Sequence, residues 1–135
     1  MSYGVAGALQ AAIYQRLKAN TALEALVGEA IHDAPPPGTA PDLMVLIGPE
    51  TVRDRSDATG SGAEHELVVS IVGDAAGFAA VKAAAVAVSD ALEGAELVLA
   101  RGRLVGLWFL RAQAERDRRG QGRRVNLVFR ARVED

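Results

Sequence analysis

The C-terminal stretch from Leu104 to Val133 constrains the fold more than any other part of the chain. From residue 124 onward the side chains alternate between apolar and mostly polar. The apolar set is Val125, Leu127, Phe129, Ala131 and Val133, and the polar set is Arg124, Asn126, Arg130 and Arg132. A period of two is typical of a strand with one buried face and one wet face. Residues 104–110 are apolar on both faces, which favours a start that is covered on both sides. Glycines and a charged run between the two arms predict a long antiparallel hairpin.

Helices and strands are also predicted before the hairpin. Apolar residues three and four apart predict one helix over residues 4–19 and another over residues 75–93. Short apolar runs predict strands at residues 43–47 and 64–72. The resulting order is α-β-β-α-β-β. It predicts an α+β fold in a single domain of residues 1–135, with a four-stranded, mainly antiparallel sheet and two principal helices on one face.

The connecting segments carry predictions of their own. Thr21 and Glu24 form a capping-box pattern that starts a short helical turn. Residues 31–33 are a short extended piece, and the three prolines at 35–37 predict a stiff loop after it. Residues 49–63 have almost no apolar anchor. They are predicted to be a long loop without order of its own, which either serves a function against a neighbouring chain or is disordered.

The residue types disfavour catalysis and bound cofactors. The chain has no cysteine, so disulfides and thiolate metal sites are excluded. His32 and His65 are the only histidines, and neither has a second ligand at metal-site spacing. Gly60-Ser61-Gly62 and Gly120-Gln121-Gly122 do not lie between a strand and a helix start, as phosphate loops do. We therefore expect no enzyme and no cofactor, and we expect His65 to be a solvated or hydrogen-bonded strand residue.

The apolar runs and the first residues bear on location. No run approaches the ~20 apolar residues of a membrane-spanning helix. The first residues lack the basic and apolar regions of a secretory signal. We therefore expect a protein of the cytoplasm that does not contact a membrane.

The net charge of −2 hides an uneven distribution of charge. Residues 1–100 carry 5 basic and 13 acidic side chains, whereas residues 101–132 carry 10 arginines against two acids. Such polarity suits nucleic acid, or subunits that meet acidic side to basic side, but it also suits a solvated strand face. One charged group crowds the hairpin turn: Arg116, Arg118, Arg119, Arg123 and Arg124. A second group lies in the predicted loop: Arg53, Arg55 and Asp57.

Small residues gather on the helix predicted at 75–93, outside its expected core stripe. They are Ala80, Ala83, Ala84, Ala87 and Ala91. The high helix propensity of alanine is one explanation. The other is a smooth surface that lets a second subunit approach closely. In that case a glutamate at Ala84 or Ala87 should leave the subunit folded but weaken the contact.

Short sequence phrases follow one another in a distinctive order over nearly the whole chain. They are residues 21–28 after the first helix, residues 31–36, residues 45–51, residues 63–65, the alanine-rich helix and the arginine-rich hairpin. In this order the chain resembles the tail-terminator (tail-completion) family of long-tailed phages and gene transfer agents. The family has no catalytic residues to carry over.

The resemblance implies a structural protein of a virion, assembled in the bacterial cytoplasm. Its homo-hexameric ring would cap the tail tube protein, end tail polymerisation and join the tail to the head-tail connector protein. DNA would pass transiently through the channel of the ring. The five alanines are then candidates for the subunit interface, and the two charged groups for contact with a tail or head partner or with the channel. A monomeric basic DNA-binding module is the alternative, which a native mass would distinguish.

Overall fold

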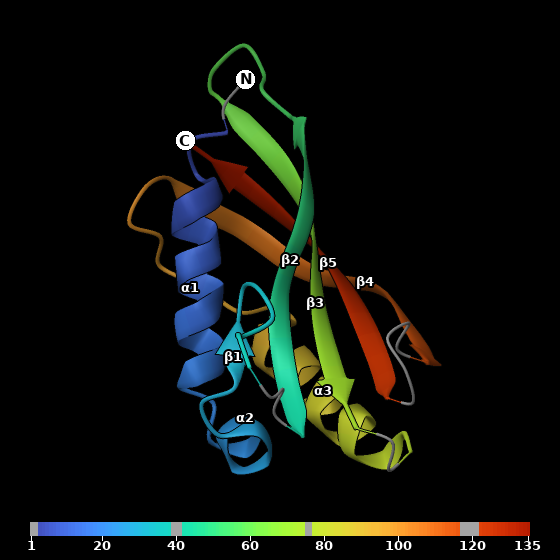
Figure 1. Cartoon of the computed structure of the whole chain (residues 1–135). Coiled ribbons are helices and arrows are strands. Elements are labelled where there is room, and N and C mark those ends of the chain that lie inside the picture. The colour runs from blue at the N-terminus through green and yellow to red at the C-terminus, as the bar shows by residue number, and fades with distance from the viewer. Residues whose placement is uncertain (1–2, 39–41, 75–76, 117–121) are drawn as a thin grey trace.

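Helices and strands are mixed along the chain in the computed structural model, which describes residues 3–38, 42–74, 77–116 and 122–135 (Figure 1). The elements are α1 (Ala6–Lys18), α2 (Thr21–Val27), β1 (Ile31–His32), β2 (Leu43–Asp54), β3 (Gly62–Gly73), α3 (Ala79–Leu92), β4 (Arg103–Arg116) and β5 (Arg123–Glu134). The strands form one sheet in the order β1-β2-β3-β5-β4. The predicted α+β class is confirmed.

The predicted C-terminal hairpin is formed by β4 and β5. These strands pair antiparallel, and β5 also pairs antiparallel with β3 along its whole length. All five apolar residues of the alternating set are buried. The period of two therefore reflects one face against the core. The position of β5 in the interior of the sheet follows from its pairing with β3 on one side and β4 on the other.

The sheet has five strands and is mixed, so the predicted count of four strands is wrong. The additional strand is β1, in which Ile31 pairs with Val45 and His32 with Leu46 in parallel. The other three pairings are antiparallel. A strand of two residues is too short to show a period, so the pattern of residues 31–33 could indicate only an extended piece.

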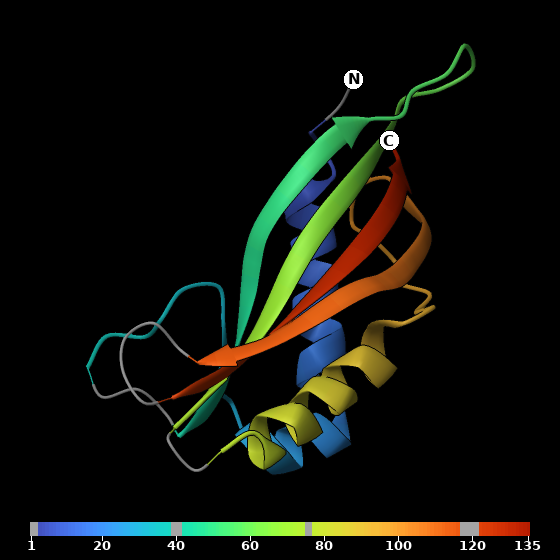
Figure 2. The same cartoon turned by 90° about the vertical axis from the view of Figure 1, so that its right-hand side faces the viewer.

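One face of the sheet packs against the helices (Figure 2). The alternate β3 residues Ala63, His65, Leu67, Val69 and Ile71 are buried in the core together with Leu9, Ile13 and Leu17 of α1. The opposite face carries no helix, and we call it the open face. It presents Glu66 and Ser70 of β3 beside Arg130 and Asn126 of β5, their partners in the register.

The helix boundaries differ from their predictions, and α1 spans Ala6–Lys18 instead of residues 4–19. Asn20, not Thr21, is the N-cap of α2, because its Oδ1 accepts a hydrogen bond of 2.9 Å from the backbone N–H of Leu23. The capping-box interpretation is therefore wrong by one residue. Gly28 ends α2 with a φ of 61°, in the left-handed region that favours glycine. α3 begins at Ala79, and residues 75–76 of the predicted helix lie outside the described residues.

The prediction of a long loop at residues 49–63 is wrong. β2 continues past Gly48 and Pro49 to Asp54, with a register shift between Ile47 and Glu50. Because the shift interrupts the ladder at this point, a proline without an N–H can lie there without ending the strand. The connection shrinks to residues 55–61, which we call the tip. It is the loop at the top of Figure 1.

Candidate functional site

The open face carries a network of ion pairs. Arg111 of β4 donates to Glu66 of β3 at 2.9 Å, and Arg103 to Glu134 of β5 at 2.8 Å. On β3, Glu64 lies 3.6 Å from Arg55 and 3.9 Å from Arg130. The acidic strand β3 is a direct neighbour of the arginine-rich β5, so the polarity along the sequence becomes cross-strand pairing in space. Much of the arginine surplus is therefore compensated within the subunit.

The two predicted charged groups lie at opposite ends of the sheet. In the register, Gly62 of β3 pairs with Glu134 near the tip, whereas Gly73 pairs with Arg123 at the far end. Arg53, Arg55 and Asp57 thus belong to the tip end. Arg116, Arg123 and Arg124 belong to the other end, which we call the turn end. Arg118 and Arg119 lie outside the described residues. The two predicted groups therefore belong to two separate sites.

At the tip end, side chains order the connection. Asp57 Oδ1 accepts hydrogen bonds from the N–H groups of Thr59 at 2.9 Å and Gly60 at 3.0 Å. These contacts, with the Thr59 hydroxyl, lower the pKa of Asp57 below its ordinary value. Arg132 of β5 donates to the carbonyl of Arg55 at 3.0 Å, which ties the tip to the sheet. The expectation that this segment has no order of its own is wrong.

At the turn end, a polar network joins three strands. The Asn126 carboxamide oxygen accepts from the Ser70 hydroxyl at 2.7 Å and from Arg124 Nε at 2.9 Å. Its amide nitrogen donates to Glu115 Oε1 at 3.0 Å. Ser70 is 1% exposed, so this bond satisfies a buried hydroxyl. The network lines a hollow of about 550 Å³ on the open face. The polar groups of the network are hydrogen-bonded to each other.

β4 exposes four large apolar side chains that were expected to be covered. They are Val105, Trp108, Phe109 and Leu110, each between 38% and 44% exposed. The expectation of cover on both sides is wrong, because β4 is an edge strand, and in the described part of the chain its only strand neighbour is β5. The Trp108 ring lies over Gly106, where a Cβ atom would collide with it, and the Arg130 guanidinium is 5.1 Å from the ring centroid. In the sequence, the feature that indicates this exposed surface is the run of residues 104–110, which are apolar on both faces.

The five predicted interface alanines divide into two groups. Ala84, Ala87 and Ala91 are buried, at 0%, 8% and 3% exposed, within the subunit's own core. α3 packs against α1 as well as the sheet, and Arg16 of α1 donates to the carbonyl of Ala91 at 2.8 Å. Small side chains let these helices approach closely. Ala80 and Ala83 are exposed, so the prediction of a subunit interface stays a prediction that these two can carry.

A groove lies at the opposite edge of the sheet, between α1 and the strands β1 and β2. Its larger part, of about 560 Å³, is lined by residues that include Tyr14, Asp33 and Ile47. Gln10 and Ile47 also line the smaller part, of about 240 Å³. At its end Glu50 accepts from the Tyr3 hydroxyl at 2.7 Å and lies 3.2 Å from Nδ1 of His65, which is fully buried. The hydrogen bond to Glu50 raises the pKa of Tyr3.

Neither a metal site nor a membrane span is found in the described ranges. No three His, Cys, Asp or Glu side chains gather there in a way that could hold a metal ion. None of the helices described is long and apolar enough to cross a membrane. The candidate sites described above are the surfaces at the two ends and the two edges of the sheet.

Two comparisons with known proteins agree over nearly the whole chain. Residues 11–134 match the family model described as "Tail completion protein gp17". The chain is also similar to a chain in a solved structure described as "Virion of native gene transfer agent (GTA) particle". The two are 63% identical over 99% of this chain and 100% of that chain, with a TM-score of 0.94. The search of curated proteins gave no match.

Proposed function

The chain belongs to the tail completion protein gp17 family, and on that premise we propose that it forms a hexameric ring at the end of a phage-like tail. The resemblance seen in the sequence phrases is confirmed at the level of the family. In this proposal the ring caps the tail tube, ends its polymerisation and joins it to the head connector, while DNA passes through its channel. The protein acts as a structural part of the virion after assembly in the cytoplasm.

The observation that carries the proposal is the full-length likeness to a chain of a gene transfer agent virion. A likeness of 63% identity over 99% of this chain and 100% of that chain supports the same structural role. The geometry of this chain supports it further, because a protein that joins two structures needs two unlike surfaces. The tip end and the turn end lie at opposite ends of β3 and differ in their residues.

We assign contact with protein partners to the two charged groups. The tip end would use Arg53, Arg55 and Asp57, and the turn end Arg116, Arg118, Arg119, Arg123 and Arg124. Within the described part of the chain, Arg53 and Arg116 form no ion pair, so their charge is available to an acidic partner surface. A channel lined with strong cations would retard passing DNA. We therefore favour an acidic protein surface over DNA as the target of these arginines.

The proposal is tested by neutralising each end separately in a host that makes particles. One variant changes Arg118, Arg119, Arg123 and Arg124 to Gln, and the matched variant changes Arg53 and Arg55 to Gln. Electron microscopy should show that the two fail at different junctions. One should leave tails of uncontrolled length, and the other should leave finished tails without heads.

Two outcomes would contradict this assignment. Normal particles from both variants, with normal melting temperatures, would show that neither end meets a partner. Complete, DNA-filled particles that fail only at delivery would show that the arginines serve DNA. A chain that stays monomeric in the presence of tails and binds duplex DNA would support the alternative of a basic DNA-binding module.

A further inference from the structure

We propose that the exposed edge of β4 in one subunit docks into the groove between α1 and the strands β1 and β2 of a second copy of this chain. This inference rests on the ring proposed above and names the two surfaces that close it. One surface projects apolar side chains from an edge strand. The other is hollow and lies at the far edge of the same sheet.

The projecting surface of β4 leaves large apolar side chains exposed in the isolated subunit. Its four large apolar side chains, named above, are each more than a third exposed. Loop groups protect only the middle of the β4 edge: Gly94 N–H donates to the Leu107 carbonyl, and the Glu93 carboxylate accepts from Phe109 N–H. Past Leu110, no strand in the described ranges pairs with this edge. A long apolar edge of this kind is a template for another chain.

The groove supplies what such an edge needs. β1 covers only Val45 and Leu46 of β2, so β2 from Ile47 to Asp54 has no second strand partner in the described part of the chain. In the smaller part of the groove, next to this edge, the side chains are largely apolar or aromatic, with Tyr3, Ile13 and Ile47 among them. Tyr14 lines the larger part. Main-chain pairing can therefore hold an incoming strand while its apolar side chains fill the hollow.

The charges of the two surfaces are complementary. Asp33 and Glu50 are the carboxylates among the lining residues, which include no lysine or arginine. β4 carries Arg103, Arg111 and Arg116 against the single acid Glu115, and Glu115 is bonded to Asn126. The Arg111 side chain pairs with Glu66 but remains 65% exposed. Opposite potentials favour the docking of unlike edges over the docking of like ones.

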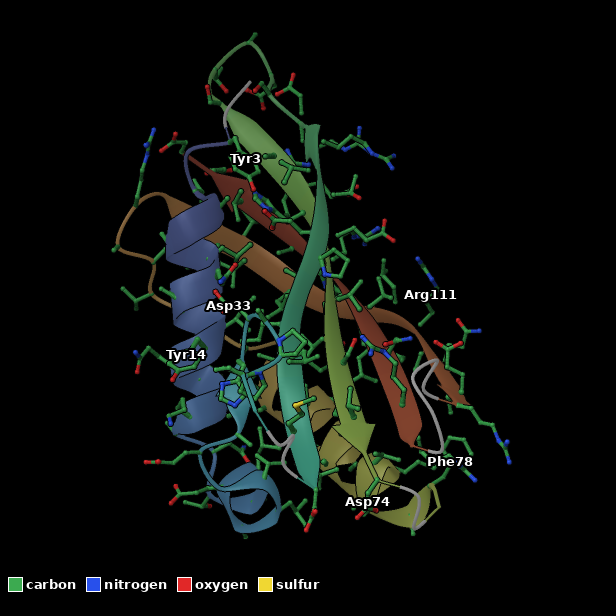
Figure 3. The ribbon with its side chains drawn as sticks, in the orientation of Figure 1. Tyr3, Tyr14, Asp33, Asp74, Phe78 and Arg111 are labelled. Atoms are coloured by element: carbon green, nitrogen blue, oxygen red, sulfur yellow. The ribbon has the colours of Figure 1, made fainter. Side chains whose placement is uncertain are left out.

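The positions of the surfaces favour a ring. Figure 3 shows Tyr14 and Asp33 on one side of the molecule and Arg111 on the other. A contact between such unlike patches is heterologous, and heterologous contacts close into rings when the rotation per subunit permits. A two-fold dimer would instead require each patch to contact itself, which would bring the β4 arginines of the two copies together.

Cross-linking tests the contact directly, because a cysteine-free chain allows thiols to be placed one at a time. Two single variants are made, Leu110→Cys on β4 and Gln10→Cys in the groove. They are co-expressed in the particle-producing host, and a short bismaleimide is added to the particles. We expect cross-linked dimers that contain one copy of each variant. Leu26→Cys on α2, 42% exposed, replaces Gln10→Cys as the control and should give none.

A substitution gives the second measurement. Leu110→Asp should lower the yield of joined particles at least tenfold, because it puts a charge into an apolar contact. Leu26→Asp is the matched control, since Leu26 is as exposed as Leu110 but lies on α2. Both variants should keep the melting temperature of the parent chain, which separates loss of docking from loss of folding.

The outcomes distinguish this inference from the function on which it rests. Normal rings in which Leu110→Cys cross-links only to itself, or not at all, would overturn the docking and leave the ring intact. The same holds if Leu110→Asp gives normal yields. A chain that never assembles with tails would overturn both proposals.

Discussion

Asn126 is the residue on which the open face of the turn end depends. Its carboxamide bonds to Ser70, Arg124 and Glu115 from three strands. Because Ser70 is almost fully buried, its hydroxyl has no water to replace a lost partner. The network therefore holds β3, β5 and β4 in one register at the turn end.

We predict that Asn126→Ala lowers the free energy of unfolding by about 1–3 kcal/mol, since it leaves the Ser70 hydroxyl buried and unpaired. Urea denaturation followed by circular dichroism measures the change. The control is Gln113→Ala, at the exposed position opposite Asn126 on β4, which should cost less than about 0.5 kcal/mol. Equal losses for the two variants would mean that the network contributes nothing specific.

Asp57 makes the order of the tip depend on pH. Its pKa is lowered by the hydrogen bonds from Thr59 and Gly60, so the folded tip prefers the carboxylate form. The stabilisation is present above the ordinary aspartate pKa of about 3.9 and is lost as the pH falls through the lower value in the folded tip. NMR shifts of the Thr59 and Gly60 amides should follow that transition. Asp57→Asn keeps an acceptor oxygen and should remove the transition without removing the turn. A midpoint above 3.9 would contradict the assignment.

At the scale of elements, α3 shows how a small-residue face can be used inside a subunit. The helical pattern predicted Ala84 and Ala87 on an outer face of α3. In the structure α1 and α2 pack against α3 and help to bury both residues. The exposed face of α3 is represented by Ala83 and by Val86, which is 59% exposed. The helical period predicts where each side chain lies around the helix axis. It does not tell how many other elements pack against the helix.

We therefore predict opposite results for two neighbouring alanines. Ala84→Glu should prevent folding or lower the melting temperature by more than 10 °C, because a charge at a fully buried position finds no partner. Ala83→Glu should fold normally, and any effect should appear in assembly alone. Thermal melts and native mass spectra of both variants provide the measurement. A folded, stable Ala84→Glu variant would contradict the buried position of this side chain.

The strands show which patterns in the sequence are informative. β5 could be predicted because Val125 to Val133 alternate against one core. β4 could not be placed, because residues apolar on both faces suit a central strand and also an edge strand that meets another chain. Pro49 suggested the end of a strand, yet β2 runs past it at a register shift. The separation of Arg53 from Arg124 depends on strand pairing, which no local pattern contains.

At the scale of the whole molecule, the charge distribution differs from that of the sequence. The acidic first part and the basic last part are brought together as neighbouring strands, so Glu64 and Glu66 face arginines of the same chain. A basic stretch is therefore a weak indicator of DNA binding when its partner strand is acidic. Within the described residues Arg53 and Arg116 form no ion pair, and they lie at the two ends of the sheet.

We predict that the isolated chain binds duplex DNA weakly, and that the arginines of the turn end account for this binding. Each phosphate contact should contribute a slope of about −0.9 in log K against log salt. Changing Arg118, Arg119, Arg123 and Arg124 to Gln should abolish the binding. Changing the paired Arg103 and Arg111 to Gln should leave it nearly unchanged, as fluorescence anisotropy would show. Equal losses in both variants would contradict the neutralisation by pairing.

Because the tip end and the turn end lie at opposite ends of the sheet, the length of the strands also fixes the distance between them. β3 runs between them for 12 residues, which at ~3.3 Å per residue is about 40 Å. If each end holds a different partner, the spacing between those partners is set by the number of residues in a strand. Loops can vary in length without altering that spacing. A paired insertion in all the long strands would shift one partner away from the other in discrete steps.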